Sequence, residues 1–299
     1  MKQSSHSSQE SRPKVIAAIP AFNEEQYIGT VVLKTKQYVD EIFVVDDGST
    51  DNTSEIARLA GATVFRNEEN KGKGVAIQRI LTEAKRRAPD TLVLLDADAQ
   101  HNPDEIPRLI KSVLEGSDLV IGSREAQANK TPRYRRIGQK VLLYSTRLLS
   151  GKKLTDSESG FRALSKRAIS EICLTESGFA VETEMIARAT DKGLKITEVP
   201  VSNIYTKDGS TLNPVAHGME VFTRIIAMIS ERRPLFFFGL SGGILLILGI
   251  IAGSRVLQIF SASGVLPVGT ALVSVLLSIV GAFSLFTGII LHVLTRGKS

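Results

Sequence analysis

The chain has 299 residues, of which 43% are hydrophobic and 23% are charged, and this composition is typical of a globular protein. Its formal net charge of +6 points to an acidic partner: a phosphorylated substrate, a nucleic acid or an anionic membrane face. The single cysteine, Cys173, excludes an intrachain disulfide, and the polar segment 1–13 lacks the apolar core of a signal peptide, so we expect a flexible tail there.

Between Lys14 and about Leu194, short apolar runs alternate with stretches of helical spacing. The runs expected to form strands are 15–20, 41–47, 62–67, 91–98 and 118–124. The stretches expected to form helices are 24–38, 53–62, 74–87 and 103–115. Alternating strands and helices indicate a parallel sheet that helices cover on both faces, and continuous Val, Ile and Leu runs fit strands buried on both sides. We therefore predict an α/β domain over residues 14–212.

The pattern changes after Pro200. Segment 213–233 has apolar residues at helical spacing, few charges in its main part, and Arg232 and Arg233 at its end. One interpretation is an amphipathic helix that lies on a bilayer surface next to the membrane. The other is an ordinary helix that packs on the core of the preceding domain.

Two later segments, 235–253 and 265–294, contain no Asp, Glu, Lys or Arg. A helix needs roughly 20 apolar residues to cross a bilayer. We therefore predict a hairpin of two transmembrane helices within 234–294, at about 235–257 and 267–294. Glycines that would let the two helices pack closely are Gly239, Gly242, Gly243, Gly249 and Gly253.

The distribution of basic residues predicts how this hairpin is oriented. The basic residues at its outer ends are Arg232, Arg233, Arg296 and Lys298. The expected connection between the helices has only Arg255. Because loops rich in Lys and Arg stay inside the cell, both ends, the α/β domain and a tail at 295–299 are expected in the cytoplasm of a multi-pass protein of the cell membrane.

Polar or conformationally special residues gather where the expected strands end. They are Pro20, Asp46, Asp47, Asp96, Asp98 and Arg124. In parallel sheets, ligands bind at the carboxyl ends of the strands. In an extended turn, the carboxylates of Asp96 and Asp98 and the amide of Gln100 could converge on one cation, and oxygen ligands suit Mg²⁺ or Mn²⁺. The alternative is that these aspartates cap a helix that begins at Asn102 and Pro103.

Other motifs carry a binding interpretation and a structural one. Glu24 in IPAFNEE could accept a hydrogen bond from a ribose hydroxyl, and Asp47 in VVDDGSTDNT from a base N–H, whereas 49–53 alone fits a turn and a helix cap. NKGKG at 70–74 lacks the spacing of a phosphate-binding P-loop. The chain has no G-x-G-x-x-G after a strand, no C-x-x-C and no H-E-x-x-H, which argues against a dinucleotide dehydrogenase and a zinc site.

The motifs stand in the order IPAFNEE, VVDDGSTDNT, NKGKG, LDADAQH, IGSR and DSESGFRALS. In this order the sequence resembles the family 2 glycosyltransferases, and more closely the dolichyl-phosphate sugar synthases, which move a sugar from a nucleotide sugar to a polyprenyl phosphate. YRRIGQ, the HG at 217–218, RRPLFFFG and FTGIILH are most similar to archaeal dolichyl-phosphate hexose transferases of S-layer N-glycosylation. The resemblance covers about 14–294. It implies a GT-A fold, which is Rossmann-like with a mostly parallel sheet, followed by the transmembrane hairpin.

The resemblance also implies roles for individual positions. The nucleotide-sugar-binding residues would be Pro20, Phe22, Glu24, Val45, Asp47, Asp96, Ala97, Asp98, Arg124 and Lys207. Asp96, Asp98 and Gln100 would bind Mg²⁺ or Mn²⁺. The acceptor phosphate would meet Arg124, Arg135, Gln139 and Ser210. The catalytic residues would be Asp98, Arg124 and Arg135.

Two positions depart from the pattern of the family. Relatives have Ser four residues after the arginine that Arg135 matches, and this chain has Gln139. Relatives have an S-K pair where this chain has Ser210 and Thr211, and Lys207 is the candidate for the missing charge. Both departures concern how the acceptor phosphate is bound.

The implied reaction is a metal-dependent, inverting transfer of a hexose from a UDP- or GDP-sugar to dolichyl phosphate at the cytoplasmic membrane face. It would supply lipid-linked sugar for protein N-glycosylation. Because the acceptor phosphate is already anionic, no strong general base is required. Segments 159–162 and 178–184 are expected to shape the sugar and acceptor side, although Glu182 and Glu184 also fit ordinary helix charges. The base and the sugar stay open.

Other classes of protein share part of these features. A processive polysaccharide synthase carries a Q-x-x-R-W motif, and this chain has no tryptophan. A family 2 transferase with another membrane-lipid or glycan acceptor, and an inactive nucleotide-sugar-binding scaffold, are the alternatives; the intact D-x-D-x-Q and GSR motifs favour an active enzyme. Nucleic acid is not expected as a partner, because neither an aromatic stacking platform nor a basic stripe accompanies the positive charge.

Overall fold

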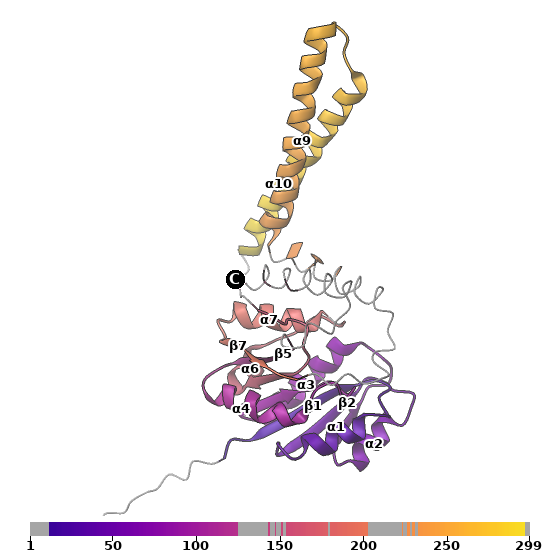
Figure 1. The fold of residues 1–299 in the computed structure, drawn as a ribbon, viewed down its shortest axis with the longest axis vertical. Coiled ribbons are helices and arrows are strands. Elements are labelled where there is room, and N and C mark those ends of the chain that lie inside the picture. The colour runs from indigo at the N-terminus through magenta and orange to yellow at the C-terminus, as the bar shows by residue number, and fades with distance from the viewer. Residues whose placement is uncertain are drawn as a thin grey trace, which may run out of the picture. The chain divides into compact units, whose positions relative to one another are not determined.

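The computed structural model describes residues 12–124, 143, 147, 151, 154–178, 180–202, 223, 226, 227, 229, 230 and 233–296. The chain divides into two compact units, Met1–Val221 and Phe222–Ser299, and each is described by itself (Figure 1). Most of the expected tail at 1–13 and most of the expected helix at 213–233 lie outside the described residues, so both stay predictions.

The first unit contains one mixed sheet. Its strands are β1 (Val15–Ala21), β2 (Glu41–Asp46), β3 (Thr63–Arg66), β4 (Thr91–Leu94), β5 (Leu119–Ser123), β6 (Arg162–Ser165) and β7 (Ile196–Pro200). Within the described part of the chain they form a seven-stranded sheet in the order β3-β2-β1-β4-β6-β5-β7. β6 pairs antiparallel with β4 and with β5, and the other neighbours pair parallel. This confirms the predicted α/β fold with a mostly parallel sheet.

Helices cover both faces of the sheet, as the apolar strands predict. They are α1 (Ile28–Thr35), α2 (Thr53–Leu59), α3 (Lys73–Arg87), the 3₁₀ turn η1 (Pro103–Glu105), α4 (Ile106–Leu114), α6 (Lys166–Glu171) and α7 (Val181–Asp191). Buried residues of α3, α6 and α7 pack with Ile16 and Ala18 of β1 on one face. Buried residues of α1, α2 and α4 pack with Ala17 and Ile19 on the other. The alternation along β1 is the period of two that places successive side chains on opposite faces.

The main differences from the predicted elements lie around β4 and beyond β5. β6 and β7 were not predicted, and β4 ends at Leu94 rather than at residue 98. Leu95 still donates to the carbonyl of Ala18 at 3.3 Å, but the N–H of Asp96 donates to His101 Nδ1 instead. The acidic residues that follow β4 therefore lie in a turn, and they leave the sheet where its ladder of hydrogen bonds stops.

The second unit consists mainly of two long helices, α9 (Pro234–Ser263) and α10 (Val268–Arg296), which lie side by side (Figure 1). Both are long and apolar enough to cross a membrane, which indicates membrane association. Arg255 lies inside α9 and not in the connection, because the helix continues beyond the uncharged stretch. The connection, residues 264–267, contains no Lys or Arg.

Small residues set how closely the two helices approach. A Cβ atom added to Gly242 would lie 2.7 Å from the carbonyl oxygen of Gly281. Ser274 Oγ donates across the pair to the carbonyl of Gly249 at 2.8 Å. Gly243 faces open space, so the helix contact uses only part of the expected glycine set.

Candidate active site

The residues expected at the strand ends gather at one edge of the sheet. β1, β2 and β4 pair parallel, and β5 runs the same way because both it and β4 are antiparallel to β6. Asp46 is the last residue of β2, and Arg124 directly follows β5. The carboxyl ends of these strands, with the loops that follow them, are therefore rich in charged side chains. We call this end of the sheet the acidic rim.

The turn after β4 presents Asp96 and Asp98 on this rim. Asp98 Oδ1 accepts from the N–H of Gln100 at 3.0 Å, and Ala99 has a left-handed backbone with a φ of 57°. The cap of the following helical turn is Asn102, whose side chain accepts from the N–H of Asp104 at 3.2 Å. The helix-cap alternative for the two aspartates is therefore not what the structure shows.

His101 fixes the backbone on one side of this turn. Its Nδ1 accepts from the N–H of Asp96 at 3.2 Å, so the neutral ring carries its proton on Nε2, which lies 3.8 Å from Asp96 Oδ2. The ring stacks on Phe161 with centroids 5.2 Å apart. Burial lowers the pKa of His101 to about 4, so the ring is neutral at pH 7 and orients Asp96 without adding charge.

Lys73, at the start of α3, joins the turn to α7. Its Nζ lies 2.7 Å from Asp96 Oδ1 and 2.8 Å from Glu182 Oε1. Burial opposes its charge, but the two carboxylates outweigh burial and raise the pKa of Lys73 above its ordinary value. Burial likewise favours the neutral form of Asp96, but Lys73 outweighs it and lowers the pKa of Asp96 to about 2. Lys73 and Asp96 are therefore both charged at pH 7, and sequence analysis had not singled out Lys73.

Asp98 and Glu24, also on the rim, have no ion pair of this kind within the described part of the chain. Burial and then the charge of Asp96 raise the pKa of Asp98. Burial, Asp98 and Asp96 raise the pKa of Glu24 to about 7. The carboxylates of Asp96, Asp98 and Glu24 therefore lie near enough to repel one another, and a divalent cation bound among them would relieve this repulsion. Among the described residues no three His, Cys, Asp or Glu side chains form a metal-binding group. The amide of Gln100 as a third ligand stays a prediction.

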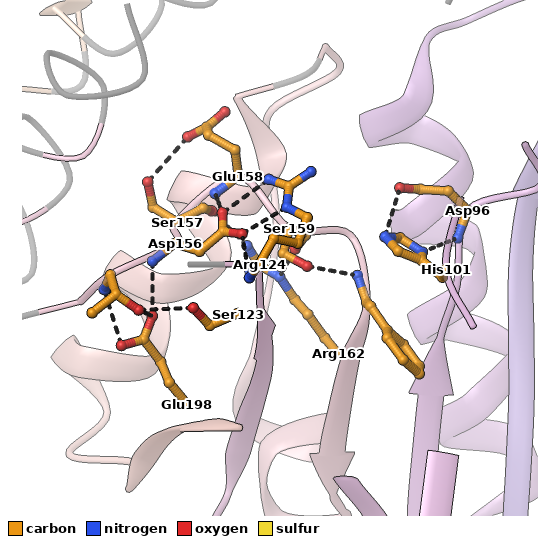
Figure 2. Close-up of polar contacts among 12 residues, drawn as sticks. Asp96, His101, Ser123, Arg124, Asp156, Ser157, Glu158, Ser159, Arg162 and Glu198 are labelled. Atoms are coloured by element: carbon orange, nitrogen blue, oxygen red, sulfur yellow. Dashed lines mark hydrogen bonds and ion pairs between the residues drawn. The ribbon is translucent and has the colours of Figure 1, made fainter. Parts of the chain in front are cut away.

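Arg124 forms an ion pair with the carboxylate of Asp156. Its Nε lies 2.7 Å from Asp156 Oδ2, and its Nη2 lies 2.9 Å from Asp156 Oδ1. Glu198 accepts from the N–H of Asp156 at 2.9 Å and so fixes the loop that carries Asp156. Figure 2 shows Asp156 between Arg124 and the Glu198 contact, apart from the pair of Asp96 and His101. The fork of Arg124 is thus held in one orientation at the end of β5.

A second buried group lies in the SGFR stretch. Arg162 is 1% exposed and donates to the carbonyls of Ser157, Ser159 and Glu182. Burial, and then the charge of Glu182, raises the pKa of the neighbouring Glu158 to about 7. Gly160 lies so close to Asp96 that an added Cβ atom would overlap both carboxylate oxygens. The SGFR stretch therefore packs against the acidic turn through Gly160.

The expected nucleotide-binding residues occupy different environments. Phe22 is 41% exposed just after β1, whereas Val45 and Ala97 are buried. The carboxylate of Asp47 already accepts from Asn67 Nδ2 at 2.7 Å and from the N–H of Gly72 at 2.7 Å. Asp47 thus holds the loop of NKGKG in place. The roles of these residues toward a nucleotide stay predictions.

Four of the expected site residues lie outside the described residues: Arg135, Gln139, Lys207 and Ser210. Of the helix charges that sequence analysis left open, Glu182 is the partner of Lys73 on the rim. Glu184 instead accepts from the N–H groups of Thr175 and Glu176 and pairs with Arg188 at 3.0 Å. One of the two is therefore part of the site, and the other stabilises the turn before α7.

Open α/β sheets bind their ligands at the carboxyl ends of the strands, which is where the acidic rim lies. Comparison with known proteins identifies the family. Residues 16–173 match the family described as Glycosyl transferase family 2, which is more than half of the chain. The chain belongs to this family and is a glycosyltransferase.

Individual relatives support the same assignment. An uncharacterized protein of Methanocaldococcus jannaschii is 40% identical over 214 residues, which cover 69% of this chain and 88% of that protein. The UDP-N-acetylglucosamine–dolichyl-phosphate N-acetylglucosaminyltransferase of Methanococcus voltae is 33% identical over 70% of this chain and 94% of its own length. Among solved structures, glucosyl-3-phosphoglycerate synthase from Mycobacterium tuberculosis in complex with Mg²⁺ and uridine diphosphate is 26% identical, with a TM-score of 0.59 over 74% of this chain and 79% of that one.

Proposed function

We propose that this glycosyltransferase moves a hexose from a UDP- or GDP-sugar to dolichyl phosphate, with inversion at the anomeric carbon, at the cytoplasmic face of the cell membrane. The product would supply lipid-linked sugar for protein N-glycosylation. The observation that carries the proposal is the grouping of the carboxylates of Asp96, Asp98 and Glu24 at the carboxyl ends of the strands, where such folds bind their ligands.

The comparisons support the substrates. The Methanococcus voltae relative is named for UDP-N-acetylglucosamine and dolichyl phosphate, and the solved structure holds uridine diphosphate and Mg²⁺. Because both named nucleotides contain uridine, UDP-sugars are the first donors to test. The two apolar helices support a lipid acceptor, since they would keep the active site beside the membrane that holds it.

Asp96, Asp98 and Gln100 would hold Mg²⁺ or Mn²⁺. The ion would act as a Lewis acid and stabilise the negative charge that develops on the departing nucleoside diphosphate. Glu24 and Phe22 would contact the nucleoside, together with Pro20, Val45, Asp47 and Ala97. Lys207 would add a positive charge beside the donor phosphates.

The acceptor would be positioned by arginines. Arg124 uses Nε and Nη2 to bind Asp156, so its Nη1 group is the part expected to meet the acceptor phosphate. Arg135, Gln139 and Ser210 would complete this site. The attacking phosphate oxygen is already anionic, so positioning and charge stabilisation, rather than proton removal, are the tasks of these residues.

The test uses membranes that contain the full chain, dolichyl phosphate and a panel of radiolabelled UDP- and GDP-sugars. We expect label to enter the organic phase with one donor and to stop entering it when EDTA removes divalent ions. Asp98→Asn should lower this transfer at least about a hundredfold, because it replaces a negatively charged ligand of the ion by a neutral amide. The matched control is Asp104→Asn, which changes an exposed carboxylate that accepts from Tyr38 OH at 2.8 Å.

Transfer that is equal with and without EDTA would contradict the metal-dependent mechanism. Label that reaches lipid but withstands mild acid would indicate a hydroxyl acceptor instead of a phosphate, because glycosyl phosphates of this kind are acid-labile. That result would favour the alternative in which a family 2 transferase acts on another membrane lipid or glycan.

A further inference from the structure

We propose that Lys73 is an internal counter-cation that competes with the divalent ion for Asp96, and that Glu182 retains Lys73 when the ion takes its place. The inference rests on the proposed metal site and adds a mechanism that regulates the affinity of this site for the divalent ion. Without nucleotide, the protein's own ammonium group would keep the affinity for the ion low. With nucleotide, the ion would bind readily.

The first step of the argument is that the carboxylate of Asp96 already has a close cationic partner. Its Oδ1 lies 2.7 Å from Lys73 Nζ. Oδ2 lies 3.8 Å from His101 Nε2, and a Cβ atom added to Gly160 would overlap both carboxylate oxygens, so Asp96 is closely packed on that side. A divalent ion binds a carboxylate oxygen at roughly 2.0–2.2 Å, closer than the ammonium does. The ion and Lys73 therefore compete for the carboxylate of Asp96.

The second step is that Lys73 has another partner ready. Its Nζ lies 2.8 Å from Glu182 Oε1, and the Glu182 side chain is only 5% exposed. An ammonium group has three N–H donors, so Lys73 can give up Asp96 and keep Glu182. The freed donor then points toward the rim, where the diphosphate of a nucleotide would supply a new acceptor. Glu182 thus makes the exchange possible without leaving a buried, unpaired ammonium group.

The third step is the contrast between the two aspartates. Asp98 accepts one hydrogen bond from the N–H of Gln100. Among the described ion pairs, Asp98 has no cationic partner as close as Lys73 is to Asp96. A divalent ion is therefore attracted first by Asp98, and the second aspartate becomes available only when Lys73 yields it. Binding of the ion to Asp96, after Asp98, therefore depends on the release of Asp96 by Lys73.

The backbone on both sides of Lys73 packs closely against the segment before α7, so the exchange is expected to move mainly the side chain. The N–H of Gly74 donates to the carbonyl of Ser177 at 2.9 Å, and a Cβ atom on Gly74 would overlap the carbonyl of Glu176. Gly72 has a φ of 95° and packs against the same segment. The glycines on both sides of Lys73 fix its Cα against the turn before α7, the helix that carries Glu182.

The experiment measures Mn²⁺ binding to the full chain in detergent, without nucleotide, from the loss of the free-ion electron paramagnetic resonance signal. Lys73→Met removes the competing ammonium, and we expect it to tighten Mn²⁺ binding about tenfold or more. Glu182→Gln removes the alternative partner and ties Lys73 to Asp96, so we expect weaker binding, by about threefold or more. Lys71→Met, an equal charge change on an exposed side chain of the same loop, should leave Mn²⁺ binding unchanged.

Opposite shifts in the two variants are the signature, because damage to the fold would weaken binding in both. Unchanged or weaker Mn²⁺ binding by a folded Lys73→Met variant would overturn the inference. If that variant does not fold, the Glu182→Gln result decides, and unchanged or tighter binding overturns it. Failure of the proposed metal site is a separate result: wild-type protein would then bind Mn²⁺ no better than Asp98→Asn, even with uridine diphosphate present.

Discussion

Asp156 decides how the guanidinium group of Arg124 is presented to a ligand. The two side chains form a fork-to-fork pair, and the N–H of Arg124 also donates to Asp156 Oδ2 at 3.1 Å. Burial opposes the charge of Asp156, but the hydrogen bonds from Arg124 outweigh burial and lower its pKa. Because a lysine has no fork, a conservative change at Arg124 would lose this orientation while keeping the charge.

We therefore predict that Asp156→Asn lowers kcat/KM for the lipid phosphate about tenfold, because Arg124 loses its fixed orientation. Arg124→Lys should cost at least as much. The double variant should be no worse than Arg124→Lys alone, since both changes remove one interaction. Steady-state kinetics with each substrate varied in turn provides the measurement, and additive losses would refute a shared role.

Glu158 carries a pH-dependent cost of folding. Burial, and then the charge of Glu182, raises its pKa from 4.5 to about 7, so the folded protein holds a proton that the unfolded chain has released. Stability should therefore fall as the pH rises from about 4.5 to about 7. Glu158→Gln removes this loss, so we predict that the variant exceeds wild type by about 2 kcal/mol at pH 8 and by little at pH 5. Thermal unfolding of the full chain across this pH range tests it; an equal difference at both ends would be the contrary result.

At the scale of single residues, sequence analysis found the acidic turn but not what surrounds it. Asp96 and Asp98 were recognisable because two carboxylates follow an apolar strand. Lys73 was not, because its partners come from the turn after β4 and from α7, which are far away along the chain. The usable signal was the lysine between two glycines, a pattern that permits close backbone packing. Sequence analysis considered only the likeness of NKGKG to a P-loop, and rejected it because the spacing does not match.

At the scale of elements, local pattern predicted the strands up to β5 and missed the next two. β6 is four residues long, begins with the buried Arg162, and pairs antiparallel between two strands that precede it in the chain. β7 contains Thr197 and Glu198 and is only partly buried, so it has no continuous apolar run. Such strands are defined by their partners rather than by their own composition, which a single sequence does not contain.

The contact between α9 and α10 gives a prediction with a built-in control. Gly242→Leu would place a side chain where the backbone of Gly281 lies, whereas Gly243→Leu would point into open space. Both changes alter helix propensity equally, so the difference between them reports packing. We expect Gly242→Leu to lower the stability of the hairpin by about 2 kcal/mol relative to Gly243→Leu. Thermal unfolding and protease resistance in detergent measure it, and equal values for the two variants would contradict the observed packing.

At the scale of the whole molecule, charge and hydropathy divide the chain in two. The first unit carries the acidic rim and nearly all of the described ion pairs, and the second is a pair of apolar helices. The composition averaged over the whole chain does not show this division. The distribution of charged and apolar residues along the chain does. The orientation of the two units in a membrane follows from neither alone. We predict it from the basic residues at the outer ends of the hairpin, together with a connection at 264–267 that has none.

The single cysteine allows this orientation to be tested directly. Cys173 is exposed in the catalytic unit. If that unit is cytoplasmic, a membrane-impermeant maleimide should label Cys173 in inverted membrane vesicles and not in sealed right-side-out vesicles. Val265→Cys, made together with Cys173→Ser, moves the thiol to the connection between α9 and α10, so its labelling should be the reverse. Labelling of Cys173 in right-side-out vesicles would place the acidic rim outside the cell, away from the nucleotide sugars of the cytoplasm, and the proposed donor would then have no access to it.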